Sequence, residues 1–271
     1  MLGGEDGAHR SIPAGSTRLN DVRSSTGVPS RIVGQVDIRR ADQRFHTELD
    51  WLNSWHSFSF GPHYDHTNTH HGALLVNNDD TVAAGGGFNS HPHRDMEIVT
   101  WVLRGVLAHQ DSEGHSGVIY PGLAQTMSAG RGIVHSERND SATEPVHFVQ
   151  MWVMPDETGL TPGYRQAEVS LGDGLVTVAS GIVEHDAAIP IHNQNAALHV
   201  ASLDVGDVVR VPSAAHVHVF MATGAATLEG VGALGVGDAV RLTADDGRRV
   251  TATEPAEVLI WEMRAGVGSP A

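Results

Sequence analysis

The chain has 271 residues, of which 40% are hydrophobic, 31 are glycine and 12 are proline. This length suffices for one large domain or two smaller ones, and the abundant glycine favours short strands and tight turns over a helix bundle. Acidic residues outnumber basic ones by 32 to 17, giving a formal net charge of −15. Such a charge repels a phosphate backbone, so direct nucleic-acid binding is not expected.

Cysteine is absent from the sequence. Disulfides and thiolate metal ligands are therefore excluded, and a reducing cytoplasm is the expected compartment. Residues 1–34 lack the apolar core of a signal peptide, and no apolar run reaches the roughly 18 residues that span a bilayer. We expect a cytoplasmic protein without membrane contacts, beginning with a flexible N-terminal arm over residues 1–34.

Patterned sequence begins at Asp37 and predicts an all-β first domain over residues 35–163. Short apolar runs at 72–77, 96–103 and 146–153 are typical of strands, and the cluster at 77–80 is interpreted as a turn between them. Residues 155–163 are rich in proline, glycine and acidic residues. We therefore place the domain boundary there.

The second domain, over residues 164–271, repeats the same rhythm. Strands are predicted at 175–179, 197–201, 216–220 and 258–261, with turns at Gly206-Asp207 and Gly237-Asp238. Short strands at regular spacing are typical of a sandwich or barrel. The similar size and rhythm of the two halves indicate a duplicated fold.

Two pairs of metal-binding residue types lie in the first domain. His91 and His93 are two residues apart, as are His135 and Glu137. Alternate residues of a strand point to the same face, so each pair can direct both side chains into one cavity. Three imidazoles and one carboxylate suit a divalent first-row metal. Spacing alone leaves Glu97 as a rival carboxylate, which would require a continuous strand from His93.

Other histidines carry weaker signals. His216 and His218 repeat the alternating pair in the second domain, but no downstream partner pair follows, so we interpret them as surface or core residues. Five upstream histidines suggest either a second metal site or, as we expect from their irregular spacing, a solvated loop. These are His56, His63, His66, His70 and His71.

Three segments resemble the recurring patterns of the pirin family in the cupin superfamily. They are 91–97 (HPHRDME), 127–137 (MSAGRGIVHSE) and 150–155 (QMWVMP). The first segment lies within residues 85–105, which fit the first cupin motif apart from one extra residue before Gly105. The second overlaps residues 132–139, which fit the core of the second motif. The resemblance extends roughly from Asp37 to Glu262 and is strongest in the first half.

The resemblance implies a bicupin fold, in which two double-stranded β-helix (jelly-roll) barrels pack together. It assigns one metal to His91, His93, His135 and Glu137, and it implies a second lobe without metal. Iron(II) is the metal expected first, while manganese, cobalt, nickel, copper and zinc also suit the ligand types. Because internal pairing replaces the usual dimer of single cupins, we expect a monomer.

The implied activity is that of a quercetin 2,3-dioxygenase, which opens the central ring of a flavonol with dioxygen and releases carbon monoxide. Glu137 would be the general base that accepts the flavonol hydroxyl proton. The alternative is an iron-binding, redox-responsive regulatory protein that acts through a protein partner. Both functions are associated with the family.

Apolar and amide side chains near the motifs could form the pocket. Trp101, Met127, Met151, Trp152 and Met154 are expected in the interior of the first domain, as core or as pocket lining. Gln125 and Gln150 could donate hydrogen bonds to an aromatic substrate, although surface exposure is the commoner position of glutamine.

Overall fold

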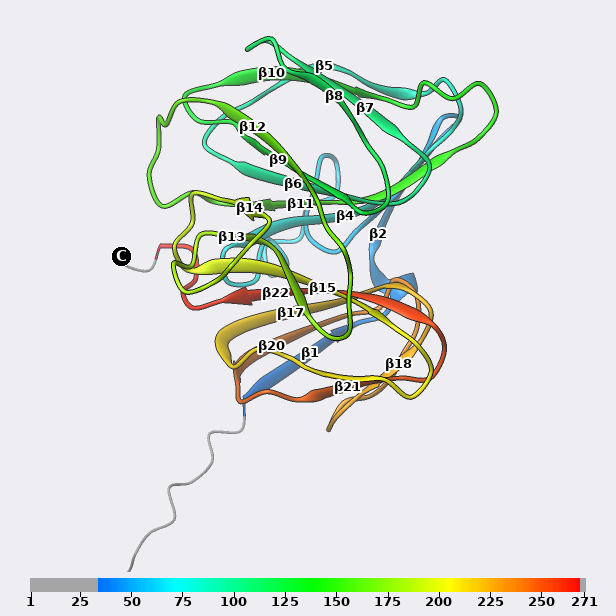
Figure 1. The fold of residues 1–271 in the computed structure, drawn as a ribbon, viewed down its shortest axis with the longest axis vertical. Coiled ribbons are helices and arrows are strands. Elements are labelled where there is room, and N and C mark those ends of the chain that lie inside the picture. Colours follow the sequence, from blue (N-terminus) through cyan, green and yellow to red (C-terminus); the bar gives the residue numbers. More distant parts are fainter. Residues whose placement is uncertain (1–33, 269–271) are drawn as a thin grey trace, which may run out of the picture. The chain divides into compact units, whose positions relative to one another are not determined.

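The structure is a computed structural model that describes residues 34–268 (Figure 1). Nearly the whole of the predicted arm over 1–34 lies outside these residues. Within them the regular structure is 22 strands and one short 3-10 helix, η1 (Ala41–Gln43), so the all-β prediction is confirmed. No helix among residues 34–268 has the length and apolar character to cross a bilayer.

An N-terminal lobe consists of a seven-stranded sheet, ordered β12-β9-β6-β11-β4-β3-β2, and a four-stranded sheet, ordered β5-β10-β7-β8. The strands of this lobe are β2 (Phe45–Leu49), β3 (Leu52–His56), β4 (Leu74–Val82), β5 (Gly87–His93), β6 (Glu97–Arg104), β7 (Leu107–Asp111), β8 (Ser116–Ile119), β9 (Leu123–Ser128), β10 (Ile133–Arg138), β11 (Val146–Val153) and β12 (Gly163–Glu168).

A C-terminal lobe has the same design, with one sheet ordered β1-β20-β17-β22-β15-β13-β14 and another ordered β16-β21-β18-β19. Its strands are β1 (Gln35–Arg39), β13 (Val176–Ser180), β14 (Ile189–Pro190), β15 (Ala196–Leu203), β16 (Val208–Arg210), β17 (Ala214–Thr223), β18 (Ala226–Leu228), β19 (Gly232–Leu234), β20 (Ala239–Asp245), β21 (Arg249–Ala252) and β22 (Ala256–Met263). The duplicated fold is confirmed by the strand order. The order β9-β6-β11-β4 in the first large sheet corresponds to β20-β17-β22-β15 in the second, and β5-β10-β7-β8 in the first small sheet corresponds to β16-β21-β18-β19 in the second.

One edge strand does not follow the sequence order. β1 precedes the N-terminal lobe in the chain but pairs with β20 of the C-terminal lobe, from Gln35 opposite Thr243 to Arg39 opposite Ala239. β12, which spans the predicted boundary at 163/164, pairs with β9 of the N-terminal lobe. The domain limits 35–163 and 164–271 therefore stay a prediction. At the start of the first range β1 pairs with the C-terminal lobe, and just beyond its end β12 pairs with the N-terminal lobe.

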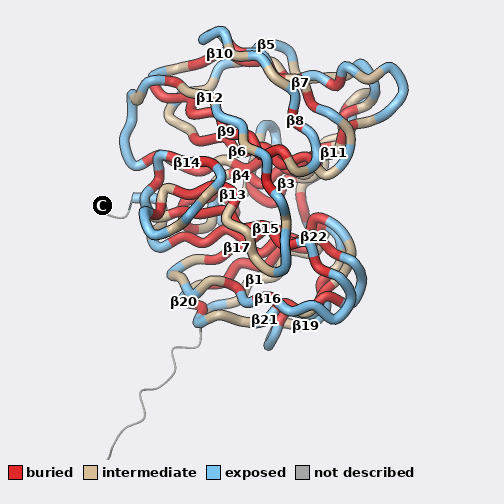
Figure 2. The backbone as a smooth tube through the Cα atoms, in the orientation of Figure 1, coloured by how far each residue is buried: buried red, intermediate tan, exposed pale blue. Residues whose placement is uncertain are grey.

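The largest core lies between the two seven-stranded sheets, where buried segments are concentrated in the middle of Figure 2. Trp101 and Met151 of the N-terminal lobe pack there with Leu198 and Trp261 of the C-terminal lobe. The prediction that Trp101 and Met151 line the interior of the first domain is therefore wrong. Neighbouring residues along a strand point to opposite faces of the sheet, so Trp101 and Met151 face the other lobe while their neighbours face the interior of the first domain. The sequence does not show which of these two faces is turned toward the other lobe.

The predicted turn at 77–80 is also wrong, because these residues continue β4 to Val82. Their side chains are held by partners on other strands: Asn78 Oδ1 lies 2.9 Å from His56 Nδ1, and Asp79 Oδ1 lies 2.6 Å from His147 Nε2. A polar run that suggests a turn is here a buried strand, since tertiary hydrogen bonds outweigh local propensity.

Candidate metal centre

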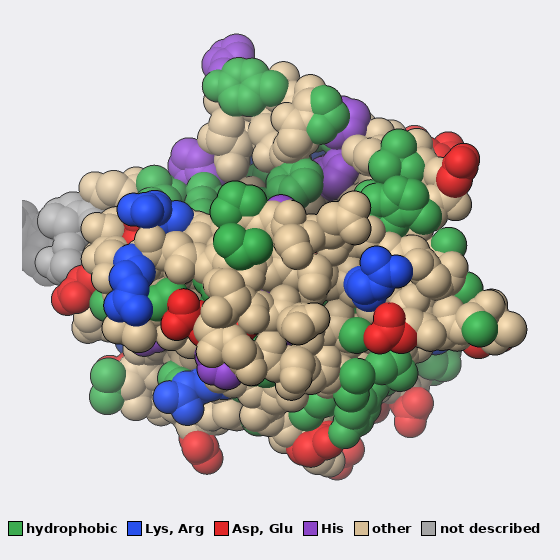
Figure 3. Space-filling model, turned by 90° about the horizontal axis from the view of Figure 1, so that it is seen from above, with side chains coloured by type: hydrophobic (Ala, Val, Ile, Leu, Met, Phe, Trp, Pro, Cys, Tyr) green, Lys and Arg blue, Asp and Glu red, His purple; other side chains and the backbone are tan. Residues whose placement is uncertain are grey.

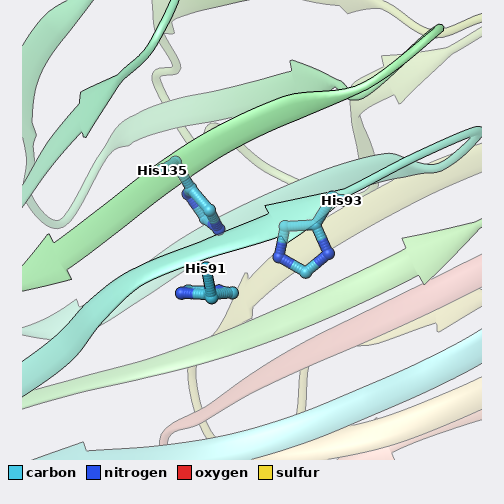
Figure 4. A group of neighbouring side chains, drawn as sticks. All are labelled: His91, His93 and His135. Atoms are coloured by element: carbon cyan, nitrogen blue, oxygen red, sulfur yellow. The ribbon is translucent and has the colours of Figure 1, made fainter.

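Three of the four predicted ligands, His91, His93 and His135, converge on one face of the adjacent strands β5 and β10 (Figure 4). His135 lies opposite His91 in the antiparallel pair, and the nitrogen atoms offered by His91, His93 and His135 all lie within 4.8 Å of one another. Gly87 permits this close pairing, since a Cβ there would lie 2.5 Å from the Glu137 carbonyl oxygen. The alternation of His91 and His93 thus brings both rings to one face beside His135, while the assignment of the ligands stays a prediction.

Each of the three imidazoles can offer a nitrogen lone pair to a shared cation. His91 Nδ1 lies 2.7 Å from the Asn89 carbonyl oxygen, which only accepts, so Nδ1 carries the proton and Nε2 is left with its lone pair. The Nε2 atoms of His93 and His135 are buried and have no hydrogen-bond partner among residues 34–268. Burial and the neighbouring histidines lower the pKa of His93 to about 4 and that of His135 to about 2, so both rings are neutral at pH 7.

A buried chain of hydrogen bonds holds His135 from behind. His109 Nε2 donates to Asp111 Oδ2 over 3.3 Å, so the Nδ1 of a neutral His109 accepts from His135 Nδ1, 3.4 Å away. This arrangement leaves His135 Nε2 unprotonated, as a metal ligand requires. Sequence reasoning missed these two residues, although their spacing on β7 is the same alternation that identified the ligand pairs.

The fourth predicted ligand, Glu137, lies with His135 and His109 in a second group of ligand atoms within 4.8 Å of one another. Gln150 Nε2 donates to both carboxylate oxygens, over 3.0 and 2.9 Å, and Trp152 Nε1 donates to Gln150 Oε1 over 3.1 Å. Burial raises the pKa of Glu137 to about 7, although the Gln150 hydrogen bonds act in the opposite direction. The carboxyl group is therefore fixed in place beside His135, with a pKa close to neutral pH.

A cavity of about 450 Å³ opens onto this group and includes His91, His93 and Glu137 in its lining. Aromatic side chains form much of its surface, with Trp51 edge-on to Phe88 and Phe60 edge-on to Trp152. Histidines (purple) lie beside hydrophobic side chains (green) at the upper part of the face in Figure 3. Another cavity, of about 480 Å³, is lined by residues such as Ser116 and Arg138 and by none of the four predicted ligands.

The cavity also has a polar side, formed by Ser54, His56, Asn78 and Asp80. Ser54 Oγ donates a short hydrogen bond to Asp80, and Thr47 Oγ1 lies 3.0 Å from His56 Nε2. Burial raises the pKa of Asp80 to about 7, with smaller contributions from Asp79 and Glu137. Aromatic and hydrogen-bonding surfaces thus face one space beside the candidate ligands.

The rival carboxylate Glu97 lies elsewhere. β5 ends at His93, Asp95 has a positive φ of 49°, and β6 starts at Glu97, so no continuous strand joins the two. Glu97 instead accepts hydrogen bonds from Ser128 Oγ over 2.6 Å and from the His192 backbone N–H over 3.2 Å. It connects the N-terminal lobe to the chain between β14 and β15.

The remaining candidates divide between core and surface. The five upstream histidines do not form one solvated loop: His66 and His70 are exposed, but His56 is buried in β3 and contributes to the cavity. His218 is fully buried, and neither ring nitrogen has a partner among the described residues, which confirms its interpretation as a core residue.

Gln125 and Gln150 are both buried, so the expectation of surface exposure is wrong. Gln150 holds Glu137 and lines the cavity, whereas Gln125 is not among the cavity residues. Of the apolar candidates, Trp152 lines the cavity, and Met127 packs in the lobe interior with Ile98 and Ile133. Met154 contributes to a different cavity near Ala73.

These residues fit a bound metal. Orphaned imidazole nitrogens are costly inside a protein, and a cation accounts for two of them at once. The available donors are nitrogen and oxygen, which suits divalent iron, nickel, manganese, cobalt, copper or zinc.

Comparisons with known proteins agree with this architecture. Residues 38–153 match the family model described as Pirin, and residues 177–263 match the one described as the quercetinase C-terminal cupin domain. A Mycobacterium tuberculosis protein named "Putative quercetin 2,3-dioxygenase" is 63% identical over 87% of this chain and 98% of its own. The protein named quercetin 2,3-dioxygenase in Escherichia coli K12 is 38% identical over 84% of this chain and 98% of its own.

A solved structure gives the same result for the fold. The bacterial pirin YhhW from Escherichia coli, in complex with nickel(II), superimposes with a TM-score of 0.79 and is 35% identical, covering 85% of this chain and 100% of that one. Sequence, strand order and the metal-binding residue types are all consistent with one assignment. The chain belongs to the pirin family of bicupin proteins.

Proposed function

We propose that the chain is a metal-dependent dioxygenase that opens the central ring of a flavonol such as quercetin and releases carbon monoxide. The observation that carries this proposal is a single cavity in which aromatic side chains, a fixed carboxylate and histidine ligands lie together. Relatives named quercetin 2,3-dioxygenase support the reaction class. We propose His91, His93, His135 and Glu137 as the metal ligands.

The bound metal, Fe(II) in our proposal, would supply a positive charge that lowers the pKa of a coordinated hydroxyl and a centre for chemistry with dioxygen. Glu137 then accepts the flavonol hydroxyl proton. Burial raises the pKa of the Glu137 carboxyl above its ordinary value, which strengthens it as a base. Gln150 keeps the carboxylate directed toward the cavity through its two hydrogen bonds.

The two sides of the cavity suit a planar phenol. Trp51, Phe60 and Trp152 offer apolar surface to aromatic rings, while Ser54 and Asp80 offer hydrogen bonds to ring hydroxyls. Exclusion of water from such a surface protects the reactive intermediate from side reactions. A polyhydroxylated aromatic substrate therefore meets complementary groups at both ends.

The test is quercetin loss under air by protein stripped of metal and reloaded with each candidate metal, with carbon monoxide trapped. We expect stoichiometric carbon monoxide from the wild type and none from His93→Ala. Glu137→Gln should lose turnover far more than bound metal, because the amide keeps the shape but cannot accept the proton. His66→Ala, at an exposed histidine outside the cavity, is the matched control.

Equal loss of metal and turnover in Glu137→Gln would show that Glu137 is only a ligand. No turnover by wild-type protein with metal bound would contradict the dioxygenase and favour the partner-dependent regulatory function.

A further inference from the structure

We propose a second metal site in the C-terminal lobe, formed by His185, His199 and Glu262, which takes a divalent cation of the zinc class. His199 lies on β15, Glu262 on β22, and His185 in the segment between β13 and β14. Their ligand atoms all lie within 4.8 Å of one another. This site is separate from the cupin motifs and from the proposed dioxygenase function.

Both imidazoles direct the same atom toward the same carboxylate oxygen. His199 Nε2 lies 3.1 Å and His185 Nε2 3.6 Å from Glu262 Oε2. The two rings are edge-on to each other, with centroids 5.4 Å apart. Two nitrogens and one oxygen therefore enclose a common point from three segments of the chain.

A hydroxyl supports each ring from its far side. Thr177 Oγ1 lies 3.1 Å from His199 Nδ1, and Ser180 Oγ lies 3.2 Å from His185 Nδ1. A hydroxyl can accept as well as donate, so each ring can hold its proton on Nδ1 and offer the Nε2 lone pair to a cation. Partners of this kind orient histidine ligands in known metal sites.

The position also permits a cation and water. The side chains of His185, His199 and Glu262 are 19%, 8% and 7% exposed, so the site is shallow but reaches solvent. Arg264 contacts the other carboxylate oxygen, Oε1, over 3.4 Å and is itself paired with Glu184 over 3.0 Å. Oε2 is thus left for the cation. Two histidines, one glutamate and a water form a known tetrahedral zinc arrangement.

The alternative is a hydrogen-bonded cluster in which both histidines donate to Glu262 without a metal. The test uses the full chain with the first centre disabled by His91→Ala and His135→Ala, because His135 belongs to both ligand groups of the N-terminal lobe. We expect one equivalent of Zn²⁺ to bind, and Co²⁺ in its place to give the intense visible bands of a tetrahedral site. His185→Gln and His199→Gln should each abolish the bands and weaken Zn²⁺ binding at least tenfold. His216→Gln, at a histidine outside the cluster, should change neither.

His185 lies outside the strands, so His185→Gln tests the site even if His199→Gln does not fold; thermal unfolding in chelator verifies folding of each variant. Absence of a bound equivalent in the disabled protein, or equal binding by His185→Gln, would overturn the proposal. Because the first centre is already removed in this background, failure here leaves the dioxygenase proposal unaffected.

Discussion

The two lobes have the same strand order, but matching inward positions carry polar side chains in the N-terminal lobe and aliphatic side chains in the C-terminal lobe. On β10 of the N-terminal lobe His135 pairs with His91 and with Asp111, while on the matching β21 Val250 pairs with Val209 and with Leu228. The C-terminal residues at these positions are buried in an apolar cluster. At these inward positions of the small sheet, the N-terminal barrel thus has polar, ionisable side chains where the C-terminal barrel has aliphatic ones.

The proposed ligands His91 and His135 occupy positions at which the C-terminal lobe has aliphatic core residues. In the N-terminal lobe the apolar residues divide into two smaller clusters, one around Val102 and Phe148 and one around Ile98 and Met127. The polar centre and its cavity account for the rest of that interior. The larger apolar clusters therefore lie in the C-terminal lobe and between the lobes.

The largest effect is expected from transferring a polar group into the apolar lobe. Leu228→Asp places a carboxylate at the position that matches Asp111, without histidine or backbone partners. An unpaired buried charge should lower the free energy of unfolding by about 4 kcal/mol or more. Denaturant unfolding measures this, with Thr227→Asp on the exposed face of the same strand as control. A loss below 1 kcal/mol would mean that the C-terminal interior tolerates charge.

The reverse exchange should remove the metal but not the fold. His135→Val gives β10 the residue found at the matching position of β21, and we expect metal affinity to fall at least about 100-fold. The free energy of unfolding of the metal-free protein should stay within about 1 kcal/mol, because an unpartnered buried nitrogen is removed. Metal titration and denaturant unfolding report the two quantities. Retained metal would show that His135 is not a ligand.

A smaller effect is expected at Asp111, which acts on the proposed ligand His135 through His109. Asp111→Asn weakens the hydrogen bond that fixes the tautomer of His109, and through it that of His135. We expect metal affinity to fall about 10- to 100-fold. Asp140→Asn, at an exposed acidic residue, is the control in the same titration. Unchanged affinity in Asp111→Asn would mean that packing alone orients His135.

The smallest effect concerns pH. Burial holds the pKa of His218 well below its usual value, with Arg241, His71 and Arg44 acting in the same direction. The unfolded chain then binds a proton that the folded protein does not, so stability is full above about pH 6.5 and falls below it. His218→Leu should reduce this fall by about 1 kcal/mol between pH 7 and pH 5.5. Denaturant unfolding of both proteins at the two pH values measures this difference. An equal loss of unfolding free energy in the wild type and in His218→Leu would assign the pH dependence to other groups.

Much of this structure could be predicted from the chain. Alternation identified the histidine pairs, and short apolar runs identified β6, β11 and β17, because both signals are local. The turn predicted at 77–80 failed because the partners of Asn78 and Asp79 lie on other strands. His185, His199 and Glu262 escaped notice for the same reason, since three separate segments bring them together.

The pairing of β1 with β20 has a consequence for synthesis. Gln35 is among the first described residues to leave the ribosome, yet its partner Thr243 follows roughly 200 residues later, on the order of ten to forty seconds at usual rates. During that interval one edge of the C-terminal sheet does not exist, and β1 has unpaired backbone groups. The C-terminal sheet is therefore completed only after β20 (Ala239–Asp245) has been translated, and early termination before β20 leaves two open sheet edges prone to association.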